Sequence, residues 1–582
     1  TLRLLPWWPA LEQVQRYLLF DEKGAEAKNI KAPWLGGPVT ISQRIGAPGQ
    51  ALQFKGQLEL DSLAQQVGLA VLGGYLQGKT AYQAQVGLDQ KQQFFVMVHS
   101  ELAGVNSSFP EPLQKTEKQV LPLTLEWSAA NTQQHGLRVQ LDSDLQLYLL
   151  ENSQAQPLFE KGYLIWRRPV PKLSTLGTGL WVDIENPQLD LDQWQEVLDR
   201  FETTTEASSA ESAVIPLRSL RIKAEQAYAL NGGLNQLTFT TQQTKPLHWR
   251  SDISSAQVAG TVQWQENTRG QVQGVVDANF QRVHWLPRDS DHPVSTEPEE
   301  FLFDLADLDL RIDEFKYDSL ALGSVTGVGR RSAADPDWWQ IQQLNLKTPY
   351  GQAQAHGGWR LRGPQRGLSL EADLKSETLG ALLDYVGFKG VLAEGKGQIV
   401  AELAWQELPW STALDQLQAN FEFDLERGRL NQVQSGTGKL LELLSLQSIS
   451  RLTTLGTDLR GLLQNGFPFD QIKGRMQLTN QLLHTDNFTV LGPVGTILWE
   501  GDVNLRQESL DINAVVVPRM DMSGAALAAG IALNPVVGIS AFLTQWLLKE
   551  PLAKAMTVHY HLSGPWAQPQ MEEVQLNATQ SE

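Results

Sequence analysis

Residues 52–60 read Leu-Gln-Phe-Lys-Gly-Gln-Leu-Glu-Leu, and the fold-class prediction starts from this pattern. Apolar Leu52, Phe54, Leu58 and Leu60 alternate with polar residues, a period of two that predicts a β-strand with one dry and one wet face. The alternation recurs along nearly the whole chain and predicts an all-β protein. Its further apolar members are Tyr82, Val86 and Leu88; Leu137, Val139 and Leu141; Leu145, Leu147 and Leu149; Leu180, Val182 and Ile184; Ile399 and Leu403; and Val503 and Leu505.

Length and composition limit the architectures and the kinds of function that this chain can have. The 582 residues require either several domains or one extended repetitive architecture, and 42% hydrophobic with 19% charged residues is typical of an ordered chain. A net charge of −18 argues against a nucleic-acid partner, because phosphate binding needs clustered Lys and Arg. The absence of cysteine excludes a disulfide framework, a thiolate metal site and a cysteine nucleophile. Because the chain begins at Thr1 with no signal-like segment, we expect it to be part of a longer protein.

Six glycines precede apolar residues two and four positions later, which predicts a degenerate structural repeat with a glycine at a tight entry turn to each strand. Strands that pair only with their neighbours build a quasi-one-dimensional sheet, and at roughly 10 to 15 residues per strand and turn the chain could supply on the order of 40 strands. The glycines are Gly56, Gly260, Gly357, Gly397, Gly474 and Gly501.

Helical periodicity is confined to a few stretches. We expect helices capped by Asp61 or Ser62 and running through Val67 to Leu72, over Leu191 to Phe201, after Ser376 through Leu379, Leu382, Leu383 and Val386, and, most strongly, over Lys439 to Leu463. Turn-rich segments at 203–212 and 289–300 predict loops that divide subregions. We therefore expect groove strands with inserted helices in 1–205, groove strands in 206–430 and a helix-containing C-terminal region in 431–582.

A half-dry sheet of this length must cover its apolar face, and the predicted helices are too few to do so. If the sheet curls lengthwise into a U, its dry face lines a trough that suits acyl chains, since each methylene moved from water onto apolar surface gains about 0.8 kcal/mol. The alternation fits packed cores of several β-sandwich domains equally well. The candidate lining residues are Leu52, Phe54, Leu58, Leu60, Tyr82, Val86, Leu88, Leu137, Val139, Leu141, Leu180, Val182, Ile184, Val262, Trp264, Ile399, Leu403, Met476, Leu478, Val503 and Leu505.

The segment from Met522 to Leu548 contains 27 consecutive residues without a formal charge, long enough to span a bilayer. Asn534 and Pro535 interrupt it near the middle, which favours a helical hairpin that contacts a membrane or caps the end of the sheet. The candidate residues for this role are Leu527, Ile531, Leu533, Pro535, Val536, Phe542 and Trp546.

Catalytic and metal-binding motifs are missing from the sequence: it has no phosphate loop, no His-Glu-x-x-His and no Gly-x-Ser-x-Gly. Three acidic or histidine groups remain weak candidates, and turns or exposed strands explain them better. We expect no enzyme activity, catalytic residue, metal or cofactor, although 18 tryptophans keep a carbohydrate-active β-solenoid as a rival. The three groups are Asp335 with Asp337 beside Trp338 and Trp339, Asp289 with Asp291 and His292, and His559 with His561.

The C-terminal quarter resembles the AsmA-like superfamily. The residues that show the resemblance are the leucine-rich 440–446, Gly-Phe-Pro-Phe-Asp-Gln-Ile at 466–472, His-Thr-Asp at 484–486, Gly-Asp-Val-Asn-Leu at 501–505 and Ala-Leu-Asn-Pro-Val-Val-Gly at 532–538.

The resemblance implies a long, twisted, U-shaped antiparallel β-sheet groove (a β-taco) with a few short helices and a C-terminal helical hairpin. It implies a periplasmic location in a Gram-negative cell, reaching toward the outer membrane, with an anchor to the inner membrane through an N-terminal helix missing from this chain. The implied partners are phospholipids, both membranes and unidentified envelope proteins, and the implied function is phospholipid movement between the membranes. The TamB branch of the superfamily suggests the alternative of a scaffold for outer-membrane protein assembly.

Overall fold

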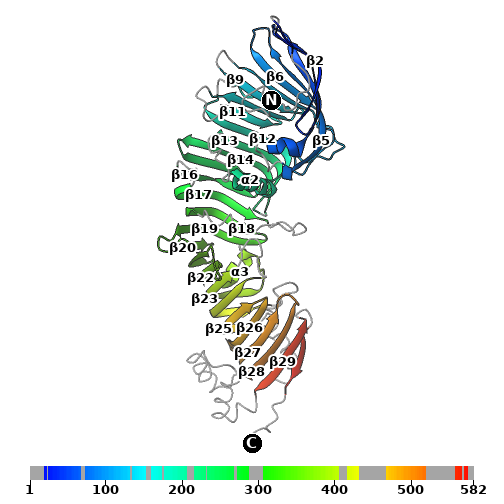
Figure 1. Cartoon of the computed structure of the whole chain (residues 1–582). Coiled ribbons are helices and arrows are strands. Elements are labelled where there is room, and N and C mark those ends of the chain that lie inside the picture. The colour runs from blue at the N-terminus through cyan, green and yellow to red at the C-terminus, as the bar shows by residue number, and fades with distance from the viewer. Residues whose placement is uncertain are drawn as a thin grey trace. The chain divides into compact units, whose positions relative to one another are not determined.

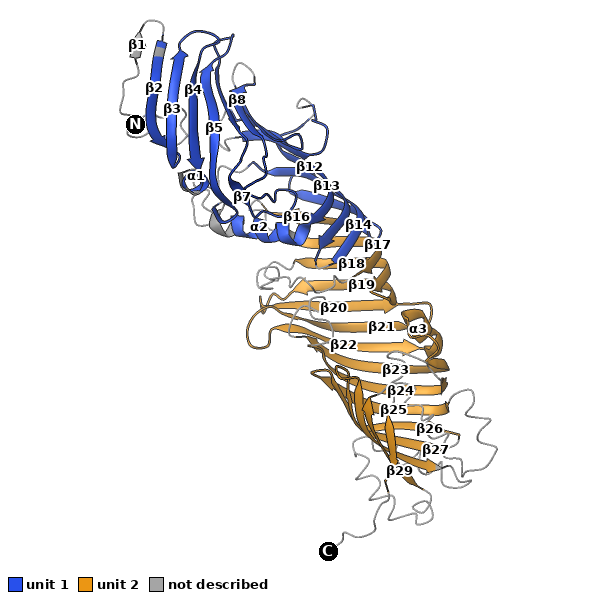
Figure 2. Cartoon of the chain, turned by 90° about the vertical axis from the view of Figure 1, so that its right-hand side faces the viewer, with its two compact units in different colours: residues 1–261 blue, residues 262–582 orange. Residues whose placement is uncertain are grey.

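The computed structural model (Figure 1) contains thirty strands and three helices within the residues that it describes. Two compact units divide it, residues 1–261 and 262–582 (Figure 2). The described residues are 19–21, 24–66, 73–130, 134–152, 159–172, 176–205, 215–230, 232–267, 272–286, 306–405, 416–431, 467–493, 495–518, 557–565 and 569–574.

Unit 1 contains two helices, α1 (Leu60–Gln66) and α2 (Leu191–Thr205). Its strands are β1 (Leu19–Asp21), β2 (Gly24–Trp34), β3 (Gly37–Ile45), β4 (Ala51–Glu59), β5 (Leu76–Leu88), β6 (Phe94–Ser100), β7 (Val105–Ser107), β8 (Leu123–Ala129), β9 (His135–Leu141), β10 (Leu145–Glu151), β11 (Phe159–Trp166), β12 (Gly179–Asp190), β13 (Leu217–Ala229), β14 (Gly232–Lys245) and β15 (His248–Ser254). Strand β16 (Val258–Glu266) spans the boundary between the units.

Unit 2 contains α3 (Leu379–Val386), which packs against β23 and near β19. The strands of this unit are β17 (Val272–Trp285), β18 (Asp307–Tyr317), β19 (Leu320–Arg331), β20 (Trp338–Lys347), β21 (Gln352–Arg360), β22 (Gly367–Ser376), β23 (Leu392–Trp405), β24 (Gln418–Leu430), β25 (Phe467–Thr479), β26 (Leu482–Gly492), β27 (Gly495–Asn504), β28 (Ser509–Pro518), β29 (Val558–Pro565) and β30 (Gln570–Glu573).

Strand pairing confirms the all-β fold class and makes the sheet mixed rather than purely antiparallel. In unit 2, β17 to β29 lie side by side in chain order (Figure 2), and each pair from β18 onward is antiparallel. The pairs β11–β12, β12–β13 and β17–β18 are parallel. Parallel neighbours need a crossover connection, and α2 lies in the one between β12 and β13.

The glycine prediction was wrong in its placement, because the six glycines lie inside strands rather than at entry turns. Gly357 and Gly501 have φ of 154° and 145°, and a Cβ on them would lie 2.0 Å from the carbonyl oxygen of Ser369 and 2.3 Å from that of Asp511. The ladder register shifts beside both glycines, after Ile341 and after Thr485. These glycines therefore allow local bends and close strand approach.

Helix predictions hold in part. The structure confirms the helices at 191–201 and after Ser376 as α2 and α3. Strand β4 ends at Glu59, and Leu60 begins α1, so the assignment of Leu60 to a strand was wrong. The segment 67–72, the helix predicted over 439–463, the loop at 289–300 and the hairpin at 522–548 lie outside the described residues, and the three-region division stays a prediction. No helix within the described ranges is long and apolar enough to cross a membrane.

Candidate functional site

One row of directly paired residues crosses unit 1 from β3 to β13, and every member is apolar. Residues opposite each other on neighbouring strands project from the same face, so the row forms an unbroken apolar stripe. Nine steps of about 4.8 Å between strands give the stripe a length of roughly 43 Å. Its members, in spatial order, are Ile41, Phe54, Ala84, Val98, Leu125, Val139, Leu147, Leu164, Val182 and Leu220.

The stripe of unit 1 changes in accessibility along its length. Phe54 is 1% exposed within a core cluster, whereas Val139, Leu147 and Val182 are only half-buried. The opposite face of the middle strands is covered instead, with Tyr163 4% exposed. On the middle strands of unit 1, the apolar stripe is therefore partly accessible to solvent, whereas the opposite face is buried.

A second row crosses unit 2 over thirteen strands, from β17 to β29, without one polar side chain. At about 4.8 Å per step it extends roughly 58 Å. In spatial order it consists of Val276, Leu308, Gly329, Ile341, Gly357, Leu370, Leu403, Ala419, Leu478, Leu483, Val503, Leu510 and Gly564.

The row of unit 2 leads into an apolar cavity of about 350 Å³. Strands β23 to β29 and helix α3 supply its walls. Leu483, Val503 and Leu510 belong both to the row and to the cavity wall, so the cavity lies on the apolar face. The other lining residues are Leu379, Leu383, Val391, Leu392, Ile399, Phe423, Leu425, Leu430, Ile472, Met476, Thr485, Phe488, Trp499, Gly501, Ile512 and Leu562.

Helix α3 forms one side of this cavity through Leu379 and Leu383. The helix lies against the backbone of β23, since a Cβ on Gly380 would lie 2.5 Å from the carbonyl oxygen of Leu392. Its C-terminus is fixed by Gly387, whose left-handed φ of 118° is typical of a helix C-cap. Close packing and the C-cap therefore hold helix α3 in place as one wall of the cavity.

The polar groups of the apolar face in unit 2 are few and uncharged. Thr485 lines the cavity and donates from Oγ1 to the carbonyl oxygen of Arg475 at 2.7 Å. Tyr560 is 4% exposed, and burial raises its pKa to about 12. The cavity wall carries no Lys, Arg, Asp or Glu among its described residues, so nothing there favours a charged group.

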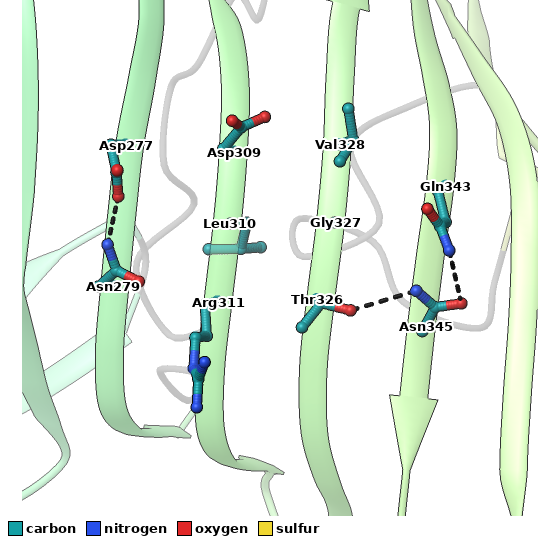
Figure 3. A pocket seen from close by; sticks show the side chains of 10 residues that line it. All are labelled: Asp277, Asn279, Asp309, Leu310, Arg311, Thr326, Gly327, Val328, Gln343 and Asn345. Atoms are coloured by element: carbon teal, nitrogen blue, oxygen red, sulfur yellow. Dashed lines mark hydrogen bonds between the residues drawn. The ribbon is translucent and has the colours of Figure 1, made fainter.

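In unit 2 the reverse face is polar where β17 to β20 pair. A polar depression of about 230 Å³ spans β17 to β20 (Figure 3), where Asn345 Nδ2 donates to Thr326 Oγ1 at 3.2 Å. Asp277 and Asn279 face the same depression and are joined by a hydrogen bond (Figure 3). One sheet therefore presents a hydrocarbon-like face and a hydrated face.

In unit 1 the face opposite the row is covered at β11 and carries a cross-strand ion-pair network beside β12 and β13. Arg168 and Lys223 both bond to Glu185, at 2.6 and 3.1 Å, and their hydrogen bonds hold the pKa of that carboxyl below its usual value. Asp183 pairs with Arg168 and Arg221 in the same network.

Most candidate lining residues share one face within their own unit. In unit 1, Phe54, Val139 and Val182 lie in the row itself, and the pairings place Leu52, Tyr82, Val86, Leu137, Leu141, Leu180 and Ile184 in the flanking rows. In unit 2, Leu403, Leu478 and Val503 lie in the row, while Ile399 and Met476 line the cavity. Leu60 begins α1, and Leu505 follows β27 and packs against the core cluster. Leu58 packs against the core of unit 1, and Leu88, Val262 and Trp264 are half-buried.

Sequence reasoning missed Trp499 and the α3 wall residues as part of the site. Trp499 lies in the run Gly-Thr-Ile-Leu-Trp at 495–499, where both strand faces are buried and alternation gives no signal. Leu379 and Leu383 were predicted as helical, yet periodicity does not say which cavity a helix borders. The sequence did contain a sign that this helix packs closely against the sheet: Gly380 lies within the helix and has no side chain to keep the two backbones apart.

The weak catalytic candidates have ordinary structural roles. Asp335 bonds to Arg360 at 3.1 Å, and His561 lies 3.7 Å from Asp511. His559 is half-buried, and desolvation lowers its pKa. The group Asp289, Asp291 and His292 lies outside the described residues. In the part of the chain that the structure covers, no group of three His, Asp or Glu side chains could hold a metal ion.

Each unit therefore presents an apolar sheet face, and unit 2 adds an apolar cavity, a combination typical of proteins that bind elongated hydrophobic molecules. The family model described as YhdP protein matches residues 1–571, and the chain belongs to the YhdP family. It is 22% identical over 600 residues to the intermembrane phospholipid transporter YhdP of Escherichia coli K12. That alignment covers 99% of this chain and 45% of the relative, so the chain spans about half the relative's length. No solved structure matches the chain.

Proposed function

We propose that this chain binds phospholipids by their acyl chains along the apolar face of its sheet and takes part in phospholipid transport between the inner and outer membranes. The unbroken apolar rows are the observation on which the proposal rests. A packed sandwich core would cover such rows with its own side chains, whereas Val139, Leu147 and Val182 remain half-buried. Acyl chains are the ligands whose chemistry best suits a long, uncharged and partly accessible apolar stripe.

The family supports the proposal. The relative named as an intermembrane phospholipid transporter aligns with nearly the whole of this chain. A transporter of this kind works in the cell envelope, and we propose that location here. Holding lipids requires no catalytic residue, so we propose a transport role and no enzyme activity.

The lining residues follow from the register. We propose that acyl chains contact Phe54, Val139 and Val182 in unit 1 and Leu403, Leu478 and Val503 in unit 2, together with the cavity residues Ile399 and Met476. Each methylene that leaves water for this surface gains about 0.8 kcal/mol. Because no row member has a polar side chain, an acyl chain sliding along a row meets no polar group of the row at successive positions.

Mass spectrometry of the purified chain tests the proposal. Native spectra and lipid extracts should contain phospholipid bound to the protein, and detergent-free delipidation followed by incubation with phospholipid vesicles should restore it. Recovery of unfolded outer-membrane polypeptides with no lipid would support the assembly scaffold instead and would overturn the proposal. Turnover of an envelope polysaccharide by the lipid-free chain would favour the glycan-active rival.

A further inference from the structure

Trp499 of β27 is a buried hydrogen-bond donor at the wall of the apolar cavity. Its side chain is 0% exposed and borders the cavity beside Phe488 and Val503. Within the described part of the chain, its indole Nε1 has no hydrogen-bond partner. An unpaired buried donor is unfavourable, and native proteins rarely leave one without a reason.

Tyr560 of β29 repeats the arrangement on the same face. Trp499 pairs with Ala514 on β28, and Ala514 pairs with Tyr560, so the three residues form one row across three strands. The Tyr560 hydroxyl is also buried and has no partner among the described residues. Only the alanine methyl lies between the two aromatic positions, whose Cα atoms are about 10 Å apart at the usual strand spacing. Two unpaired donors therefore flank one small residue.

The surroundings restrict what could accept these hydrogen bonds. Thr485 Oγ1 donates to the Arg475 carbonyl and does not accept from either buried donor, and the other described wall residues have no side-chain oxygen. A phosphate group would bring a negative charge to a cavity without a Lys or Arg in its described lining, where an unpaired charge is strongly disfavoured. The fitting acceptor is neutral, cannot donate, and is attached to hydrocarbon.

We propose that the Trp499 N–H and the Tyr560 O–H form a binding station for the ester carbonyls of a diacyl phospholipid whose chains enter the cavity. The inference rests on the proposed lipid-binding function and adds the chemical group that is recognised. Both donors are buried, so neighbouring side chains shift as the lipid enters. Its occupant is held by the chain-bearing ester region, while the charged headgroup stays outside the cavity.

Ester-linked and ether-linked lipids with identical headgroups and chain lengths provide the test, because the ether lacks the carbonyl acceptor. Delipidated protein is incubated with vesicles that hold both phosphatidylethanolamines in equal amounts, and the bound ratio is measured by mass spectrometry. We expect the ester preference of the original protein to exceed that of Trp499→Phe, and that of Tyr560→Phe, by about fivefold each, the usual net effect of one hydrogen bond. The double variant should lose the preference.

The control is Trp359→Phe, a buried tryptophan of β21 in a separate cluster of unit 2, which should keep the original ratio. Equal binding of both lipids by the original protein, as expected if a water molecule satisfies the donors, would overturn the station and leave the proposed function standing. A preference that survives in the double variant would also overturn it. Failure to bind either lipid would instead remove the proposed function and the station with it. Thermal melting of every variant separates loss of folding from loss of the carbonyl contact.

Discussion

Two aspartates placed in the half-open part of the unit 1 row should remove lipid binding with a modest effect on folding. The double variant Val139→Asp/Leu147→Asp changes directly paired residues on β9 and β10 that are both half-buried. Losing half of the burial of each side chain costs about 1 kcal/mol apiece, and the two like charges opposite each other cost about 0.2–1 kcal/mol more. A multi-strand sheet should tolerate this change.

The effect on lipid binding should be much larger. A carboxylate pressed against an acyl chain loses hydration without a partner, and even a penalty of about 1.4 kcal/mol per aspartate lowers affinity tenfold. We expect bound lipid to fall about 100-fold for the pair. A photo-crosslinking amino acid at Leu164, the next member of the row, reports the contact, and mass spectrometry identifies the crosslinked lipid.

The matched control is Gln140→Asp/Gln146→Asp, which puts the same two charges opposite each other on the same strands but on the opposite face, where Gln140 is exposed. This control should crosslink lipid as the original protein does. Equal lipid crosslinking in the two double variants would refute the assignment of the row as the lipid-contacting surface. Urea unfolding of both variants checks that the comparison is between folded proteins.

Two further outcomes follow from the geometry. Hydrogen bonds from Arg168 and Lys223 lower the pKa of Glu185, so the stability that this carboxylate contributes is present above its pKa in the unfolded chain and is lost as the pH falls through its pKa in the folded protein. The variant Glu185→Gln should therefore show a smaller drop in melting temperature between pH 7 and pH 3 than the original protein. An unchanged drop would contradict this. Gly380→Ala should destabilise unit 2 by about 1–3 kcal/mol in urea unfolding, because the added methyl would lie 2.5 Å from the Leu392 carbonyl oxygen, whereas a stabilised protein would show that helix propensity dominates there.

Local patterns in the sequence were sufficient to predict strands with one apolar face. The alternation in 52–60 predicts β4 because side-chain direction in a strand has a period of two, whatever the neighbours are. Pairing partners and register depend on contacts distant in sequence, so the row from Ile41 to Leu220 could not be read from any one segment. Sequence reasoning therefore named residues of the apolar face without showing that Phe54, Val139 and Val182 belong to one row.

The antiparallel prediction failed where the connections are long. The helix predicted from Leu191 lies in the connection between the parallel strands β12 and β13. The turn-rich 289–300 similarly falls between the parallel strands β17 and β18. Antiparallel neighbours can be joined by short turns and parallel ones cannot, so connection length was the signal that was not used.

The two kinds of surface on the apolar face have different consequences for a moving lipid. A row with no polar member, such as that from Val276 to Gly564, offers no hydrogen bond to a lipid at any strand and so favours sliding. Unpaired donors at Trp499 and Tyr560 would add a preferred stop, since an ester carbonyl gains a hydrogen bond there. A gain of about 1 kcal/mol per bond lengthens residence severalfold without trapping the lipid. The station would thus set where lipids dwell within unit 2, while the rows leave passage between strands unhindered.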